Sequence, residues 1–257
     1  MKFKKLTYKH TLISCFAAYF SEAVVNNLAP LFFVIFQNRF GLTYSQLAAL
    51  AFINFFTQLV TDVVAAKVSE KIGIRNSMAL GHIFLSAGLI AMSLLPHNFV
   101  CFAFSIMIYS VGCGFCEVIV IPIGDALPSE AKSNKMSLLH SFYCWGQVCT
   151  ILVTTLLLSF LGENSWSYIP LMWALIPALN LIYIFRMPIP ESVLSNNKIN
   201  FSELFRSKTF IIVILLMACS GASEVSVSQW ASLFAEKGLK ITKALGDILG
   251  PCLFAVF

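Results

Sequence analysis

Seven long apolar segments constrain the fold of this chain more than any other feature. They cover residues 10–36, 45–66, 77–95, 99–121, 136–161, 168–185 and 209–230, and an eighth begins near Gly246. About 20 apolar residues are needed to cross the hydrocarbon core of a bilayer as a helix. Lipid cannot satisfy free backbone polar groups, so these segments are expected to be helical. The sequence therefore predicts an all-α membrane protein with several spans.

The composition supports this class and argues against several others. Apolar residues make up 58% of the chain and charged residues 11%, whereas soluble domains average roughly half and about a quarter. The basic residues are scattered between the apolar segments, so the net charge of +5 does not indicate nucleic-acid binding. Cys113 and Cys116 have CxxC spacing but lack a second pair or a neighbouring His in the sequence. We expect no metal and no cofactor.

The distribution of Lys and Arg predicts the orientation in the membrane, because basic residues favour cytoplasmic loops. If the N-terminus is cytoplasmic, 13 of the 17 basic residues lie on the inside. The four on the outside are Arg39, Lys237, Lys240 and Lys243. We predict a multi-pass protein of the plasma (inner) membrane with a cytoplasmic N-terminus.

The spacing of the segments predicts the domain organisation. Residues 1–186 would form a six-helix bundle, residues 187–208 a cytoplasmic linker with a short helix over 201–205, and residues 209–257 the start of a second bundle. Two six-helix halves are a common design of secondary transporters. Residues 247–257 extend only about 16 Å as a helix, too short to cross. We therefore expect the C-terminal half of the protein to be missing from this sequence.

Three carboxyl groups lie inside predicted spans: Glu22 in the first, Glu117 in the fourth and Glu224 in the seventh. An ionisable residue at the centre of a span costs about 2.5–3.5 kcal/mol or more. These three segments contain no Lys or Arg, so protonation or contact with a hydrated cavity must accommodate the carboxyls. Protonation would connect them to proton movement and a cavity to a polar substrate. We predict that Glu117 couples transport to protons, with Glu22 and Glu224 as alternatives.

Other polar residues inside the spans are candidates for the wall of a substrate cavity. Asn54, Gln58 and Asp62 recur every four residues and form a polar stripe on the second span. Hydrogen bonding between helices is the more common role of a single Asn or Gln in a membrane, so both interpretations stay open. The predicted substrate-binding residues are Asn26, Asn27, His140, Gln147 and Trp230. Pro122 and Pro128 are expected to end the fourth helix.

The loop after the second span reads AKVSEKIGIR over residues 66–75. It resembles the loop motif between helices two and three of the major facilitator superfamily, with matches at Glu70, Lys71, Gly73 and Arg75. Ala66 stands where that motif begins with Gly, and Ile74 occupies a position that is usually basic. The resemblance implies that this loop stabilises one conformation by charge pairing near the inner surface.

Further stretches resemble the fucose–proton symporter branch of the same superfamily. In that branch an acidic residue follows the Asn pair of helix one, where this chain has Ala29 and Pro30. The resemblance covers nearly the whole chain and reaches a little beyond the first half of that fold. The matching stretches are NNL at 26–28, GFCE at 114–117 with Pro122, LLHSF at 138–142, and GASE at 221–224 with Gln229 and Trp230.

Together these features predict a secondary active transporter for a small polar, sugar-like solute. The resemblance implies alternating access, in which two helical bundles rock around a central site. The expected partners are the small-molecule substrate, protons and the lipid bilayer. An efflux pump for amphiphilic compounds on the same fold is the main alternative. A membrane-embedded enzyme is more remote, because no HExxH zinc motif or GxSxG elbow is present.

Overall fold

The computed structural model describes residues 7–127, 132–190 and 206–256, and within these ranges it contains helices and no strands. The predicted all-α class is therefore confirmed for the described residues. The larger helices are α1 (Tyr8–Leu31), α2 (Phe33–Phe40), α3 (Tyr44–Ile72), α4 (Ile74–Leu94), α5 (Phe99–Ala126), α6 (Lys132–Leu161), α7 (Tyr168–Ile184) and α9 (Lys208–Lys237). The chain then forms α10 (Lys243–Asp247), a π-helical turn (Ile248–Cys252) and α11 (Leu253–Val256).

Most of these helices meet the requirements for a membrane span. Among the described residues, α1, α3, α4, α5, α9 and residues Met136–Leu161 of α6 are long and apolar enough to cross. Helix α7 is apolar but shorter, at 17 residues. Each of the seven predicted apolar segments therefore corresponds to helix in the structure.

Two proline-containing segments differ from the expectation. The first apolar segment is not one continuous helix. The helix is interrupted at Phe32, two residues after Pro30, which divides the segment into α1 and α2. The prediction that Pro122 ends the fourth helix is wrong, since α5 continues through Pro122 to Ala126. Proline is tolerated inside membrane helices because neighbouring groups can satisfy the backbone carbonyl that it leaves without a donor. Pro128, the predicted helix over 201–205 and most of the predicted linker lie outside the described residues.

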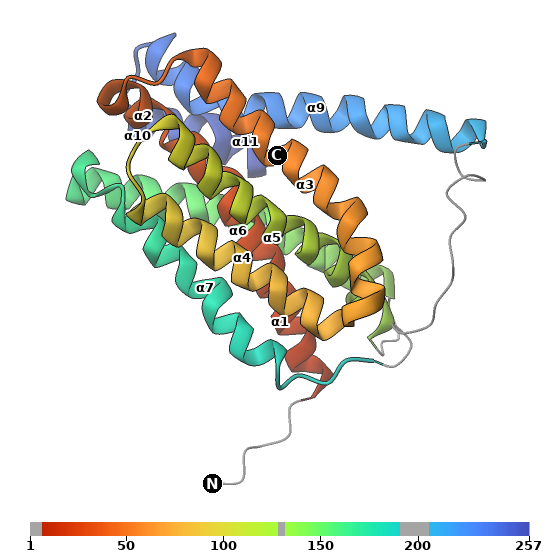
Figure 1. Ribbon diagram of the computed structural model, residues 1–257. Helices are drawn as coiled ribbons and strands as arrows, with labels where there is room; N and C mark the ends of the chain where they lie inside the picture. Colours follow the sequence, from red (N-terminus) through yellow and green to blue (C-terminus); the bar gives the residue numbers. More distant parts are fainter. Residues whose placement is uncertain (1–6, 128–131, 191–205, 257) are drawn as a thin grey trace, which may run out of the picture.

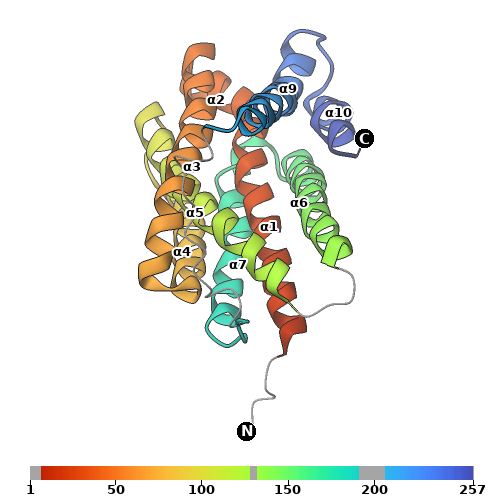
Figure 2. The same cartoon turned by 90° about the vertical axis from the view of Figure 1, so that its right-hand side faces the viewer.

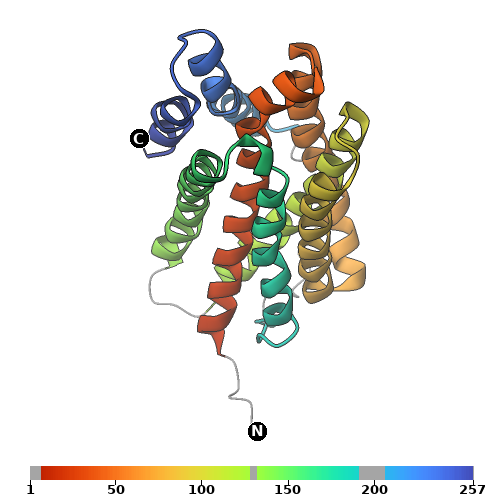
Figure 3. The same ribbon diagram turned by 90° about the vertical axis from the view of Figure 1, so that its left-hand side faces the viewer.

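Helix α1 is the centre of the bundle. It packs against α5, α6 and α7, and Figure 3 shows α6 and α7 on either side of it. Helices α4 and α5 approach closely because small residues face each other. A Cβ added at Gly112 would lie 2.6 Å from the backbone nitrogen of Leu85, and one at Gly88 would lie 2.5 Å from that of Tyr109. Small residues of this kind allow tight helix packing in lipid.

Aromatic side chains fill the end of the bundle that holds α2. Trp166 packs edge-on against Phe32, Phe36 and Phe102, with ring centroids 5.4–5.9 Å apart. A second apolar cluster at the opposite end includes Cys15, Met78, Ile119 and Ile184. On α1 the buried carboxyl of Glu22 lies between Tyr19 of the second cluster and Val24 of the first.

Helix α9 is arranged differently from the other long helices. It lies across the end of the bundle that holds α2, and its first half extends beyond the bundle (Figures 1 and 2). Residues 211–220 are all exposed, whereas Gln229, Ser232, Leu233 and Ala235 in the second half are buried. The predicted helix over 209–230 is present, and the buried residues of α9 lie in its C-terminal half.

Candidate functional site

Two of the predicted carboxyl groups meet in the middle of the bundle, joined by one amide. Gln58 Nε2 of α3 donates to Glu22 Oε1 of α1 at 3.2 Å and to Glu117 Oε2 of α5 at 2.8 Å. Glu22 is 4% exposed and Gln58 9% exposed, whereas Glu117 is partly buried. Three helices that are distant in the sequence therefore place a hydrogen-bonded carboxyl pair inside the bundle.

No positive charge balances this pair within the described part of the chain. No Lys or Arg there lies within 4.0 Å of either carboxyl, and the ion pair found is elsewhere, between Lys243 and Asp247. Asp62, one turn beyond Gln58 on α3, adds a third acid whose Oδ1 is buried without a partner among the described residues. Burying an ionised carboxyl without a counter-charge is costly. The arrangement therefore favours a state in which this group of acids holds protons.

A second polar layer lies one helical turn from the carboxyl pair. Asn54 Nδ2 of α3 donates to Asn26 Oδ1 of α1 at 3.1 Å, and Ser110 Oγ of α5 donates to Asn54 Oδ1 at 2.6 Å. Asn26 Nδ2 also lies 3.5 Å from the hydroxyl of Tyr143 on α6. The four-residue spacing of Asn54 and Gln58 on α3, matched by Glu22 and Asn26 on α1, stacks the two layers. The stripe on α3 was predicted from the sequence, but the contact of Ser110 with Asn54 and that of Tyr143 with Asn26 were not.

The backbone of Asn26 provides a further contact, between α1 and α9. In a helix its carbonyl would accept from the backbone N–H four residues later, but that residue is Pro30, which has none. Gln229 Nε2 of α9 donates to this carbonyl at 3.0 Å instead. A cavity of about 10 Å³ adjoins the contact and is lined in part by Asn54 and Tyr109. That volume is about enough for one water molecule.

The remaining predicted cavity residues take separate positions. Asn27 Nδ2 donates to the carbonyl of Ala23 in its own helix at 2.8 Å, and Trp230 packs on Phe33 with ring centroids 5.6 Å apart. Gln147 is buried. His140 is exposed, although its ring lies 5.5 Å from that of Tyr19, and Glu224 is exposed on α9. The structure thus brings Glu22, Glu117 and Asn26 together but does not bring Glu224 to the carboxyl pair.

The loop motif forms a tight turn at the end of the bundle away from α2. Gly73 connects α3 to α4 with φ at 84°, a conformation that suits glycine. Arg75 donates to the main-chain carbonyls of Ile184 and Met187, the latter at 2.7 Å. In the described residues Glu70 has no ion-pair partner, so the charge pairing implied by the resemblance is not seen here. Arg75 instead binds the C-terminal end of α7, where carbonyls without partners attract cations.

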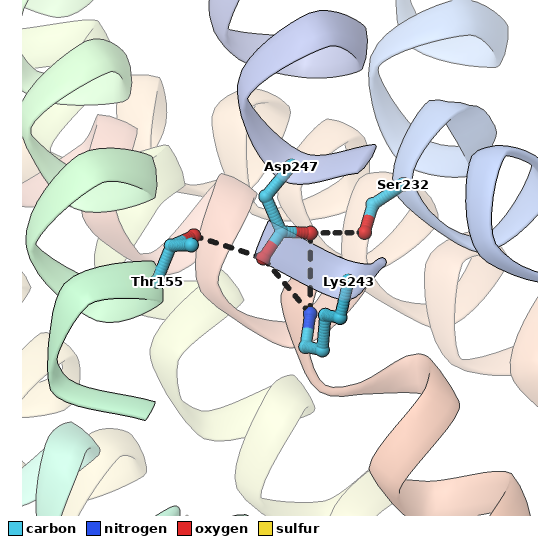
Figure 4. Close-up of polar contacts among 4 residues, drawn as sticks. All are labelled: Thr155, Ser232, Lys243 and Asp247. Carbon is cyan, nitrogen blue, oxygen red and sulfur yellow. Dashed lines mark hydrogen bonds and ion pairs between the residues drawn. The ribbon is translucent and has the colours of Figure 1, made fainter. Parts of the chain in front are cut away.

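A buried ion pair joins α10 to α6 and α9 (Figure 4). Asp247 is 0% exposed and accepts from Thr155 Oγ1 at 2.8 Å and from Ser232 Oγ. Lys243 Nζ lies 3.1 and 3.0 Å from its two oxygens. This network was not predicted from the sequence, although the four-residue spacing of Lys243 and Asp247 on a short helix is a signal for an ion pair.

Another missed network is centred on His82, which is fully buried in α4. Its Nδ1 lies 2.9 Å from the carbonyl of Met78 and 3.6 Å from Cys116 Sγ, and its Nε2 lies 2.8 Å from Asn180 Nδ2. Asn180 Oδ1 accepts from Ser14 Oγ at 2.8 Å. Because Nδ1 must donate to the carbonyl and Nε2 must accept from Asn180, the ring is neutral here. The network connects α1, α4, α5 and α7.

These features define a multi-pass helical membrane protein with carboxyl, amide and hydroxyl groups inside its bundle. The chain matches the family model described as Major Facilitator Superfamily over residues 11–257. It therefore belongs to the major facilitator superfamily of membrane transporters, as the loop motif predicted. No curated protein matches the sequence.

Solved transporter structures share this fold. The inward-open xylose transporter XylE of E. coli has a TM-score of 0.63 at 12% identity, covering 97% of this chain and 65% of that chain. A D-xylose-proton symporter gives a TM-score of 0.62 at 16% identity, with the same two coverages. A bacterial homologue of the human drug peptide transporters PepT1 and PepT2 gives 0.59 at 16% identity, covering 91% of this chain and 55% of that chain. The chain thus spans less than two thirds of the length of these transporters, and the likeness is one of fold.

Proposed function

We propose that this chain is part of a proton-coupled secondary transporter that moves a small polar, sugar-like solute by alternating access. The observation that carries the proposal is the buried contact of Glu22 and Glu117 with Gln58, without a basic partner in the described residues. Burial among apolar groups disfavours the charged form of a carboxyl, so a buried carboxyl pair is stabilised when it binds a proton. Proton binding and release at this pair would be coupled to the conformation of the bundle.

The polar layer beside the carboxyl pair supports a solute rich in hydroxyl groups. Asn26 and Asn54 each provide an amide with both donor and acceptor atoms, which suits sugar hydroxyls. Two of the structurally similar proteins are described as xylose transporters, and the resemblance to the fucose–proton symporter branch agrees in substrate class. Asn27, His140, Gln147 and Trp230 remain proposed members of the cavity wall, and Glu224 a proposed third coupling carboxyl. In this proposal residues 1–186 form the first bundle, residues 187–208 a cytoplasmic linker and residues 209–257 the start of the second bundle.

The substrate class can be tested by uptake into membrane vesicles that contain the whole transporter. Labelled xylose, fucose, glucose and a labelled dipeptide would be supplied under an imposed pH gradient, acid outside, with and without a protonophore. We expect one of the sugars to accumulate, and the protonophore to abolish that accumulation. Accumulation of the dipeptide alone would contradict the sugar assignment, and uptake insensitive to the pH gradient would contradict proton coupling.

A further inference from the structure

Gln58 joins the two carboxyl groups into one hydrogen-bonded unit. It is nine-tenths buried, and its amide nitrogen contacts both Glu22 and Glu117. We propose that Gln58 is a positioning residue that lets Glu22 and Glu117 hold one proton between them. This inference rests on the proposed proton-coupled function and assigns a residue and a stoichiometry within it.

The donors and acceptors of the three side chains limit how many protons the pair can hold. A glutamine amide offers two N–H donors and one carbonyl acceptor, an ionised carboxylate only accepts, and a protonated carboxyl can also donate. Nε2 already serves both carboxyls, whereas Oε1 is buried without a partner among the described residues. Two ionised carboxylates would therefore leave this buried acceptor unsatisfied. Two protonated carboxyls would give the amide nitrogen weaker acceptors.

A single proton resolves both problems. If Glu22 is protonated, its O–H can donate to Gln58 Oε1 after a rotation of the amide, while Nε2 continues to donate to Glu117. Glu22 is the more deeply buried carboxyl and makes the longer contact, 3.2 Å against 2.8 Å. Burial disfavours its charged form more strongly, so the proton is assigned to Glu22. The proton comes from water and returns to water, and no other bond forms or breaks.

Other titratable groups surround the pair and must be separated from it in any test. No Lys or Arg in the described residues supplies a charge to this cluster. Tyrosine and cysteine side chains are ordinarily neutral near neutral pH. Asp62 is therefore the neighbouring acid whose protonation would add to the carboxyl signal of the pair. The neighbours are Tyr19 on α1, Asp62 on α3, His82 on α4, Cys113 and Cys116 on α5, and His140 and Tyr143 on α6.

The test is infrared difference spectroscopy of the whole transporter in lipid, in an Asp62→Asn background and without substrate. The signal is the carbonyl band of protonated carboxyl groups as a function of pH. We expect a band from one carboxyl at neutral pH, which Glu22→Gln removes and Glu117→Gln retains. Gln58→Leu removes the N–H donors that keep Glu117 ionised. The band should then grow towards two carboxyls, with carboxyl protonation beginning about one to two pH units higher, the effect expected for a hydrogen bond to a charged group.

A matched control is Thr61→Val on the same helix, because Thr61 is also buried but donates to the carbonyl of Thr57 in its own helix. This variant should leave the band unchanged. If Gln58→Leu does not fold, Gln58→Met removes the same amide while keeping an unbranched chain. An unchanged band in a folded Gln58 variant would overturn the proposal. The measurement needs no transport, so it separates the two proposals. If the wild-type transporter shows no proton-driven uptake but the band still changes in the Gln58 variants, the proposed function is contradicted and the role of Gln58 stands.

Discussion

Gln229 on α9 donates a hydrogen bond to the main-chain carbonyl of Asn26 on α1, at 3.0 Å. The carbonyl is available because Pro30 lacks the N–H that would otherwise bind it. A single proline thus creates an acceptor on α1 that the second part of the chain uses. The contact lies beside the Asn26–Asn54 layer, so it connects α9 to the candidate site.

This relationship predicts the outcome of a double-mutant cycle. Gln229→Leu should destabilise the protein by about 1–3 kcal/mol, because it leaves a buried acceptor without a partner. In a Pro30→Ala background the restored backbone N–H of residue 30 can bind the carbonyl of Asn26. Gln229→Leu should then lower the free energy of unfolding by less. Thermal unfolding of the purified variants gives the coupling energy. Equal costs in the two backgrounds would show that Pro30 does not create the acceptor that Gln229 uses.

Glu117→Gln should abolish proton-driven accumulation while leaving exchange of substrate at equal pH. Glutamine at position 117 removes the negative charge that, in the proposed pair, lies beside the proton of Glu22, and exchange does not require that proton to leave. The measurement is uptake under a pH gradient compared with counterflow in the same vesicles. Glu22→Gln and Glu224→Gln test the other two carboxyls in the same way. Full gradient-driven accumulation by the Glu117→Gln protein would remove Glu117 from the coupling mechanism.

Gly112→Ala should destabilise the bundle by about 1–3 kcal/mol through overpacking, since the added Cβ would lie 2.6 Å from the backbone nitrogen of Leu85. Gly221→Ala on α9 is the control, because nothing lies within 4 Å of its added Cβ. That variant should be neutral or gain up to about 1 kcal/mol from helix propensity. The measurement is the melting temperature of each variant in detergent. Equal melting temperatures for the two variants would contradict the close α4–α5 contact.

The buried ion pair predicts a marked asymmetry between single and double variants. Lys243→Met leaves the carboxyl of Asp247 buried without its cation and should cost about 3–5 kcal/mol at the contact of α6 with α10. Lys243→Met combined with Asp247→Leu removes both charges and should cost less. A cysteine crosslink between α6 and α10, measured in each variant, reports whether the contact survives. A double variant as disrupted as the single one would contradict this account.

The orientation predicts which introduced cysteines react with a membrane-impermeant reagent. In a background that lacks the eight native cysteines, a Cys at position 195 should be protected in intact cells and one at position 164 should be labelled. The reason is that 13 of the 17 basic residues lie on the predicted inside, and basic residues favour cytoplasmic loops. Labelling at 195 from outside would reverse the predicted orientation.

The helices themselves could be predicted from the sequence, because the length and hydropathy of each apolar segment determine whether it can span a bilayer. The relative arrangement of the helices could not be predicted from the sequence. Glu22 and Glu117 are 95 positions apart, and nothing local to either indicates that Gln58 would join them. The stripe of Asn54, Gln58 and Asp62 predicted which face of α3 is polar, whereas its partners on α1 and α5 depend on packing.

The structure also differs from the sequence-based predictions at Pro122, in the short helix α10 and in the path of α9. Pro122 was expected to end a helix, but α5 continues through it. Membrane helices can do so where neighbouring groups satisfy the backbone carbonyl that the proline leaves without a donor. The Lys243–Asp247 pair was not predicted, and the burial of Asp247 depends on Thr155 and Ser232, which lie on helices that the local sequence does not specify. The path of α9 across the bundle likewise depends on contacts of its second half, which hydropathy does not report.

The stacking of Asn54, Gln58 and Asp62 on α3 has a consequence for how the length of this helix can vary. Each residue inserted or deleted between Asn54 and Asp62 turns everything beyond it by about 100° around the helix axis. One such change between Asn54 and Gln58 would separate Asn54 from the face that carries Gln58 and Asp62, and one between Gln58 and Asp62 would separate Asp62 from it. Substitutions in α3 are therefore expected to be tolerated more readily than single-residue insertions or deletions within this interval.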